Sequence, residues 1–197
     1  MGSDQERRAP SLAGRRPVVL TGGLMRLRRT ALALLLGLAL GAGPGRAKLP
    51  KDYDEFAQRY AKEAVKPEGA AKLWFEAIFV YANTDTREAG RRMLSLVMAD
   101  AKWERNEYFV DRMKNHPAIF RSYAKGATPA NHYAMDPDAF TLVITASEAD
   151  KFRDEAWRLA LHSGGADADR CLTLARTADG HWQLRLYSEI YADVKDG

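Results

Sequence analysis

Two polar segments of the sequence carry side chains that could recognise a ligand, and each interrupts an otherwise apolar pattern. The first spans residues 121–133 and the second spans residues 162–170. A simple hairpin needs only about two to five loop residues, so the length of the second segment predicts a shaped loop. Together the segments supply nine candidate ligand-binding residues: Arg121, Tyr123, Asn131, Tyr133, Ser163, Gly164, Gly165, Asp167 and Arg170.

The second segment has residue types that suit a small anion. Gly164 and Gly165 would let backbone N–H groups converge on one point, and Arg170 could add a fork of donors for a carboxylate or phosphate. In the alternative reading, the two glycines only turn the chain, and Asp167 pairs with Arg170 or caps the turn. The partner is therefore left open between an unknown small anion and a protein.

No set of residues in the sequence has the spacing of a catalytic or metal site. Ser163 directly follows His162, and neighbouring strand residues point to opposite faces, which disfavours a Ser–His pair. Asp167 and Asp169 lack the further oxygen ligands of a calcium loop. We assign no catalytic residue, no metal and no cofactor, and we lean against an enzyme. Cys171, the single cysteine, is expected to be a small packed thiol.

The first half of the chain after residue 47 has the period of amphipathic helices. Apolar residues recur at helical spacing over about residues 52–65, and a nearly all-apolar helix over about 68–82 should be the most buried element. Asp85 is the expected N-cap of a third helix. A fourth helix is expected from about 103 to 115, ending before Pro117.

Beyond Gly126 the period changes to two, which is typical of strands. Alternating runs begin at Phe140 and at Ala156, and two more flank Asp179-Gly180. Asp-Gly between such runs indicates a tight hairpin in which both turn residues take positive φ. Helices followed by strands predict an α+β fold: about four N-terminal helices packed on a C-terminal antiparallel β-meander of three to five strands.

The positive charge of the chain is concentrated at its N-terminus. The sequence has 30 Lys and Arg, 26 Asp and Glu, and a formal net charge of +4. Residues 1–47 hold 8 Arg, no Lys and 2 acidic residues, so residues 48–197 carry 22 basic and 24 acidic residues, a net charge of −2. A basic surface for nucleic acid is therefore not expected in the second part.

The N-terminal part has the composition of an export signal. A short basic stretch after Met25 precedes the apolar run Ala31–Ala42, and small residues stand at Gly45 and Ala47. This pattern predicts a signal peptide cleaved after Ala47, with the true start at Met25. We expect residues 1–47 to be an N-terminal extension and signal peptide, and residues 48–197 to be a single globular domain.

The expected location is therefore the periplasm or the outside of the cell, with membrane contact only through the signal segment during export. The alternative is a protein anchored in the membrane by an uncleaved Ala31–Ala42 segment. The uncharged stretch around that run is short of the roughly 20 residues that a membrane span needs, which favours cleavage.

The two polar segments also carry a family resemblance. The patterns Ser122-Tyr123-x-x-Gly-Ala-Thr-Pro-x-Asn131-x-Tyr133 and Ser163-Gly-Gly-Ala-Asp167-x-x-Arg170 resemble those of an uncharacterised domain family of bacterial proteins. The likeness covers about residues 50–194. The family's second motif usually continues Ser-Pro-Arg-Pro after the Asp, where this chain has Ala-Asp-Arg-Cys. The resemblance implies no activity and no catalytic residue.

Three functions remain open from the sequence. The favoured one is a non-catalytic periplasmic or secreted binding or interaction module. The alternative is a small-molecule-binding or enzymatic domain of the cone-shaped α+β (NTF2-like) type, which the ending Asp179-Gly-His-Trp-Gln-Leu184 resembles. It would have an apolar cavity between the second helix and the sheet, with at least one buried titratable group. A structural role at the cell envelope is the third.

Overall fold

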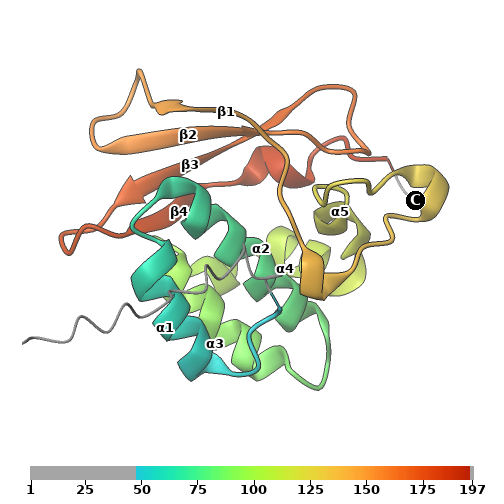
Figure 1. Ribbon diagram of the computed structural model, residues 1–197, viewed down its shortest axis with the longest axis horizontal. Coiled ribbons are helices and arrows are strands. Elements are labelled where there is room, and N and C mark those ends of the chain that lie inside the picture. The colour runs from blue at the N-terminus through green and yellow to red at the C-terminus, as the bar shows by residue number, and fades with distance from the viewer. Residues whose placement is uncertain (1–47, 196–197) are drawn as a thin grey trace, which may run out of the picture. The chain divides into compact units, whose positions relative to one another are not determined.

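The structure, a computed structural model, describes residues 48–195, in which five α-helices are followed by four β-strands. The predicted signal peptide and its cleavage site lie outside the described residues. The α+β prediction is confirmed, with the helices in the N-terminal part and the sheet in the C-terminal part (Figure 1). The helices are α1 (Tyr53–Glu63), α2 (Pro67–Ala82), α3 (Arg87–Val97), α4 (Glu107–Asn115) and α5 (Ala118–Arg121). Across residues 48–195, no helix combines the length and apolar character needed to cross a membrane.

Two helix boundaries differ from those expected. The N-cap of α3 is Thr86 rather than Asp85, because Asn83 Oδ1 accepts the Asp85 N–H at 3.0 Å and closes a turn there. The expected fourth helix is broken at Asn106 into a 3₁₀ turn and α4. Asn106 causes the break by acting as the N-cap, since its side-chain oxygen accepts the Phe109 N–H at 3.1 Å.

The strands form one antiparallel sheet in the order β1-β2-β3-β4. The expected run from Phe140 is mostly not a strand: Phe140 follows a 3₁₀ turn and packs into the core, and β1 begins only at Ile144. β2 begins at Ala156, as expected. The strands are β1 (Ile144–Ala149), β2 (Ala156–Leu161), β3 (Arg170–Arg176) and β4 (Trp182–Leu186).

The turn between β3 and β4 also differs from the expected two-residue form. The Thr177 N–H donates to the His181 carbonyl at 2.8 Å, which leaves three residues in the loop. Gly180 has φ +88°, and Asp179 is not in the positive-φ region. A three-residue loop needs only one left-handed residue, which explains why the Asp-Gly pair still marks the hairpin.

The core lies between α2 and the inner face of the sheet. Trp74 of α2 is fully buried and contacts aromatic rings of α4, α5 and the segment after β4. The inner face of the sheet is built from leucines at alternate positions: Leu159, Leu161, Leu172, Leu174 and Leu184. Beside this core, a pocket of about 280 Å³ opens between the first turns of α2 and the segment that leads into β1, with Gly69 and Ile144 in its lining, so the cavity of the cone-shaped alternative stays a prediction.

One buried titratable group, which the cone-shaped alternative also requires, is present on α2. Glu76 is 0% exposed, and its carboxylate lies 2.7 Å from the Arg59 guanidinium of α1. Burial, the largest cause, raises the pKa of Glu76, while Arg59 acts in the opposite direction. The group ties α1 to α2, so it has a structural partner rather than a cavity beside it.

The helices lie on one side of the sheet (Figure 1). The opposite face, called here the outer face, carries Arg158 and Cys171, whose side chains alternate with the inner leucines. Because no helix covers this face in the described part of the chain, its side chains can meet other molecules.

Candidate functional site

The two polar segments singled out in the sequence meet in the structure. Ser122 Oγ and Ser163 Oγ are 2.7 Å apart and buried, and the Gly164 N–H donates to the Ser122 carbonyl at 2.9 Å. Residues 41 positions apart in the chain are therefore joined by a buried contact. The first segment leaves α5, and the second connects β2 to β3, so the junction links the helices to the sheet.

The two glycines of the second segment are required by close packing. A Cβ atom on Gly164 would lie 1.9 Å from the Ala127 carbonyl oxygen, and one on Gly165 would lie 2.2 Å from Tyr133 Oη. Their N–H groups donate to the first segment and to Ser163 Oγ. The geometry thus uses these amides for the junction itself.

The two tyrosines hold the C-terminal segment, defined as residues 188–195. Tyr123 Oη donates to the Ile190 carbonyl at 2.7 Å, and Tyr133 Oη donates to the carbonyl of Lys195. Both tyrosines are fully buried, and burial raises the pKa of Tyr123 well above its usual range. The Tyr123 hydroxyl therefore stays protonated and acts as a donor at ordinary pH.

Asp167 and Arg170, both of the second polar segment, also contact the C-terminal segment. Lys195 Nζ lies 2.6 Å from the Asp167 carboxylate, and this bond lowers the pKa of Asp167. Arg170 Nε donates to the Ala192 carbonyl at 3.1 Å, and its Nη2 donates to the Asp193 carbonyl at 3.4 Å. In the structure, neither the Asp167–Arg170 ion pair nor a free guanidinium fork is seen.

The remaining two candidates lie in the first segment without reaching the C-terminal segment. Asn131 closes its own turn, since Oδ1 accepts the Thr128 N–H at 2.9 Å and Nδ2 donates to the Gly126 carbonyl at 3.0 Å. Arg121 ends α5, and its buried Nε has no hydrogen-bond partner within residues 48–195. The two motifs therefore build an anchor for the C-terminal segment, and binding of an outside ligand by these residues stays a prediction.

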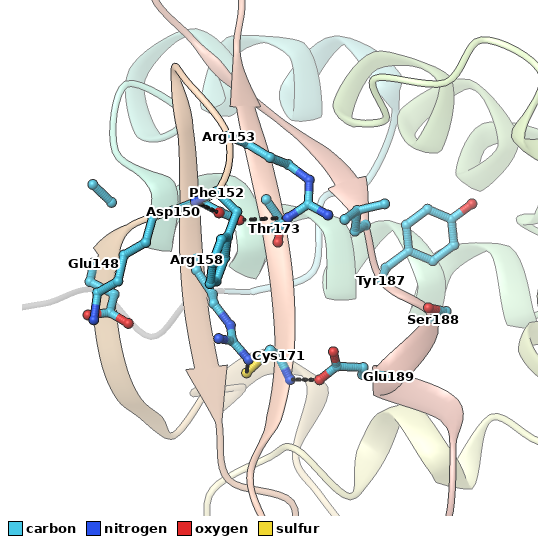
Figure 2. A pocket seen from close by; sticks show the side chains of 13 residues that line it. Glu148, Asp150, Phe152, Arg153, Arg158, Cys171, Thr173, Tyr187, Ser188 and Glu189 are labelled. Carbon is cyan, nitrogen blue, oxygen red and sulfur yellow. Dashed lines mark hydrogen bonds and ion pairs between the residues drawn. The ribbon is translucent and has the colours of Figure 1, made fainter.

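A separate cleft of about 450 Å³ opens on the outer face of the sheet. Its floor is formed by β2 and β3, and its walls are the β1–β2 hairpin and the turn after β4, as Figure 2 shows. None of the nine candidate residues from the sequence lines it. A volume in this range suits a small ligand.

Strand register places three chemically distinct side chains on the floor of the outer-face cleft. Arg158 of β2 is directly opposite Thr173 of β3, and Cys171 lies two residues before Thr173 on the same face. Arg158 Nη2 donates to Cys171 Sγ at 3.0 Å, and this contact is the main cause that raises the pKa of Arg158. Cys171, expected from the sequence to be a small packed thiol, is half-buried and lines the cleft.

The polar groups of this floor have spare hydrogen-bonding capacity. Thr173 is only 5% exposed, yet its hydroxyl has no partner among the residues that the structure describes. Arg158 has no carboxylate within ion-pair distance in that same part of the chain, so most of its five donors remain available. A hydroxyl on the floor of a cleft that has no protein partner can donate to, or accept from, a ligand atom.

The β1–β2 hairpin adds an aromatic ring and a second arginine to the cleft. Asp150 accepts the Phe152 N–H at 2.8 Å and an Arg153 N–H at 3.1 Å, and these bonds lower the pKa of Asp150. Phe152 is 87% exposed at the rim, with the half-exposed Leu186 on the opposite wall. The cleft therefore combines cationic, polar and apolar groups with three carboxylates, those of Glu148, Asp150 and Glu189.

The sequence contained one usable signal for this cleft. Phe152 stands among charged residues in a turn between two strands, where a large apolar side chain has no structural need. Arg158, Cys171 and Thr173 gave no signal because strand register alone brings them together. In the part of the chain that is described, no group of three or more His, Cys, Asp or Glu side chains is placed to hold a metal ion.

Comparison with known proteins gives a family and no activity. Residues 48–196 match the family described as Domain of unknown function (DUF6935). No curated protein and no solved structure matches the chain. Because the match covers most of the sequence, including both polar motifs and the strands of the outer-face cleft, the chain belongs to the DUF6935 family.

Proposed function

We propose that this protein is an exported, non-catalytic binding module, and that it binds a small organic anion in the outer-face cleft. The observation that carries the proposal is the juxtaposition on the cleft floor of Arg158, with free donors, and Thr173, whose hydroxyl has no partner among residues 48–195. The partner expected from the sequence, a small anion, is kept, while the binding position moves from the two motifs to the cleft.

The chemistry of the floor supports a carboxylate or phosphate as the bound group. Hydrogen bonds from a guanidinium to an anion are shorter and stronger than neutral ones, and Arg158 can donate two of them to one carboxylate. The Thr173 hydroxyl can donate a third, because the two residues are cross-strand partners. Binding would also give the Thr173 hydroxyl the hydrogen-bond partner that residues 48–195 do not supply.

The walls support an apolar portion in the same ligand. Phe152 and Leu186 are two of the four large apolar side chains that the described residues expose, and both line this cleft. Exposed apolar groups around convergent polar groups are typical of small-molecule sites. An aromatic carboxylate or an organic phosphate satisfies both requirements.

Export is supported by the sequence of residues 1–47 and by the position of the domain. The family match begins at residue 48, immediately after the predicted cleavage site at Ala47. The Arg-rich composition of residues 1–47 contrasts with the nearly neutral composition that follows. A division at this point agrees with a leader that is removed from a complete domain.

Calorimetric titration of the purified protein with benzoate, phenyl phosphate and inorganic phosphate tests the proposal. We expect saturable binding of the organic anions, weakened at least tenfold in Arg158→Gln because a charge-assisted hydrogen bond contributes about 1.5–3 kcal/mol. Thr173→Val should weaken it about threefold to tenfold. The matched control is Arg185→Gln, an exposed arginine of β4 that does not line the cleft.

Two results would contradict the proposal. One is the absence of saturable binding for all three anions. The other is an equal loss of affinity in Arg158→Gln and Arg185→Gln, which would mean that only the general charge of the protein matters. Circular dichroism of each variant shows that the comparison is made between folded proteins.

A further inference from the structure

Cys171 lies in the outer-face cleft, and the chain has no second cysteine. It is the single cysteine of the chain, so no disulfide can form within one molecule. Its thiol is on the exposed side of β3 and lines the cleft. A cysteine alone would not define a site, but here two further observations point to a ligand beside it.

The first observation is Thr173, a residue that is only 5% exposed and lines the same cleft, and whose hydroxyl has no partner among residues 48–195. The second is Arg158, which contacts Cys171 Sγ at 3.0 Å and lies opposite Thr173 in the sheet. An anion held between Arg158 and Thr173 would therefore lie next to the sulfur atom. Figure 2 shows Arg158 extending along the floor to Cys171.

The environment of the sulfur also suits its reaction. The nucleophilic form of cysteine is the thiolate, and Arg158 Nη2 lies 3.0 Å from Cys171 Sγ. The Cys171 N–H donates to the Glu189 carboxylate at 3.2 Å, which connects the floor of the cleft to the wall formed by the turn after β4. Thiol exchange further requires an accessible sulfur, and the cleft supplies that access.

We propose that Cys171 is a site of thiol–disulfide exchange with small, carboxylate-bearing disulfides, which Arg158 and Thr173 hold beside the sulfur. The Cys171 thiol releases its proton to solvent, and the thiolate attacks one sulfur of the bound disulfide. A new Sγ–S bond forms as the ligand's own S–S bond breaks. The other half leaves with the electron pair as a thiolate, so Cys171 is oxidised and half of the disulfide is reduced.

This inference rests on the proposed anion site and deepens it by naming the ligand class. Export would place the cleft where small disulfides persist, because such compartments are oxidising. The reaction is stoichiometric and leaves a mixed disulfide on the protein. It therefore agrees with a binding module that is modified rather than one that turns over substrate.

The test compares the rates at which the full chain reacts with two disulfides of opposite charge. Oxidised glutathione carries carboxylates, and cystamine carries amines, while adduct formation at Cys171 is followed by intact mass. We expect glutathione to react at least tenfold faster than cystamine in the unmodified sequence. In Arg158→Gln this ratio should fall to about threefold or less, and in Arg185→Gln it should not change.

The ratio of rates separates recognition from general reactivity. Arg158→Gln also removes a donor from the sulfur, which slows both disulfides, so reaction with the neutral probe iodoacetamide is measured in parallel. Thr173→Val should lower the ratio while leaving the iodoacetamide rate within about twofold. Cys171→Ser should form no adduct.

The outcomes distinguish this inference from the proposed function. Equal rates for the two disulfides, or no adduct with either, would overturn the exchange site even if Cys171→Ser still binds benzoate. Conversely, preferential reaction with glutathione in a protein that shows no saturable anion binding would contradict the proposed function and leave the exchange site standing.

Discussion

Single polar atoms of the two motifs determine where the C-terminal segment lies. The Tyr123 hydroxyl and the Arg170 guanidinium donate to backbone carbonyls of residues 190–193. These carbonyls belong to a stretch with little regular secondary structure beyond one 3₁₀ turn, so side chains must satisfy them. The motif residues therefore have a structural role that is independent of any ligand.

Tyr123→Phe tests this role at one atom. The substitution leaves the Ile190 carbonyl buried without its donor, and we expect the free energy of unfolding to fall by about 1–3 kcal/mol in urea denaturation followed by fluorescence. The control is Tyr108→Phe, at a residue that is 51% exposed, where the change should stay within about 0.5 kcal/mol. Similar losses in both variants would show that the Tyr123 bond is not important.

The Arg59–Glu76 pair makes a prediction that depends on pH. Removing Arg59 leaves a buried carboxylate without its main partner, so Arg59→Met should lower the free energy of unfolding by about 3–5 kcal/mol at pH 7. Because the pKa of Glu76 in the folded state is raised, the folded protein binds this proton more tightly than the unfolded chain does. The cost of the ionised carboxylate is therefore present at neutral pH and is relieved as the pH falls towards 4.5.

Urea denaturation at pH 7 and pH 5 measures this effect. The difference between Arg59→Met and the unmodified protein should be smaller at pH 5. In the double variant Arg59→Met/Glu76→Gln, the difference from the single variant Glu76→Gln should depend much less on pH, because the buried carboxylate is gone and Arg59 contacts only the partly exposed Glu63, at 2.8 Å. A pH-independent cost in the single variant Arg59→Met would contradict the assignment to Glu76.

At the scale of elements, the junction of the two polar segments fastens the loops at one end of the sheet. Gly164 and Gly165 let the β2–β3 connection approach the chain after α5 at distances that a side chain would prevent. The Lys195 N–H then donates to the Gly165 carbonyl at 2.8 Å. The junction and the C-terminal segment therefore depend on each other.

Gly164→Ala should disrupt this junction. The new methyl group would meet the Ala127 carbonyl, so we expect a loss of about 3 kcal/mol from overpacking and faster amide exchange at Lys195. Gly126→Ala is the matched control: its φ is +85°, and the space around it is open, so it should cost about 1 kcal/mol from backbone strain alone. If exchange at Lys195 is unchanged in Gly164→Ala, the two features are not coupled.

At the scale of the whole molecule, the N-terminal extension and the domain differ in charge and in composition. The excess of arginine lies in residues 1–47, while residues 48–197 are close to neutral. The prediction of a cleaved leader therefore concerns the full chain, expressed with its N-terminus intact in a Gram-negative host. We expect the exported protein to begin at Lys48, as measured by N-terminal sequencing.

A variant at the cleavage position sharpens this prediction. Ala47→Glu should block processing because the peptidase requires a small residue there, whereas Lys48→Gln should be processed normally. Recovery of the unprocessed chain from the cytosol as the only product would contradict export. Full-length protein in the membrane fraction would instead favour an anchor formed by Ala31–Ala42.

The fold class, the order of the elements and the nearly neutral charge of the domain could be predicted from the sequence, because hydrophobic periodicity and composition are local properties of the chain. The sequence placed α2 at the centre, and it marked the two polar segments that meet in the structure. It misplaced the cap of α3 and the start of β1, where Asn83 and Phe140 make contacts that a periodic pattern does not record.

The contacts of the polar side chains could be read only from the folded structure. Tyr123, Asp167 and Arg170 all form hydrogen bonds with the C-terminal segment. These contacts join positions far apart in the chain, so no local pattern encodes them. Likewise, Arg158 and Thr173 face each other only because β2 and β3 pair in one particular register. A shift of one residue in that register would move these side chains to the opposite face of the sheet and remove the cleft floor.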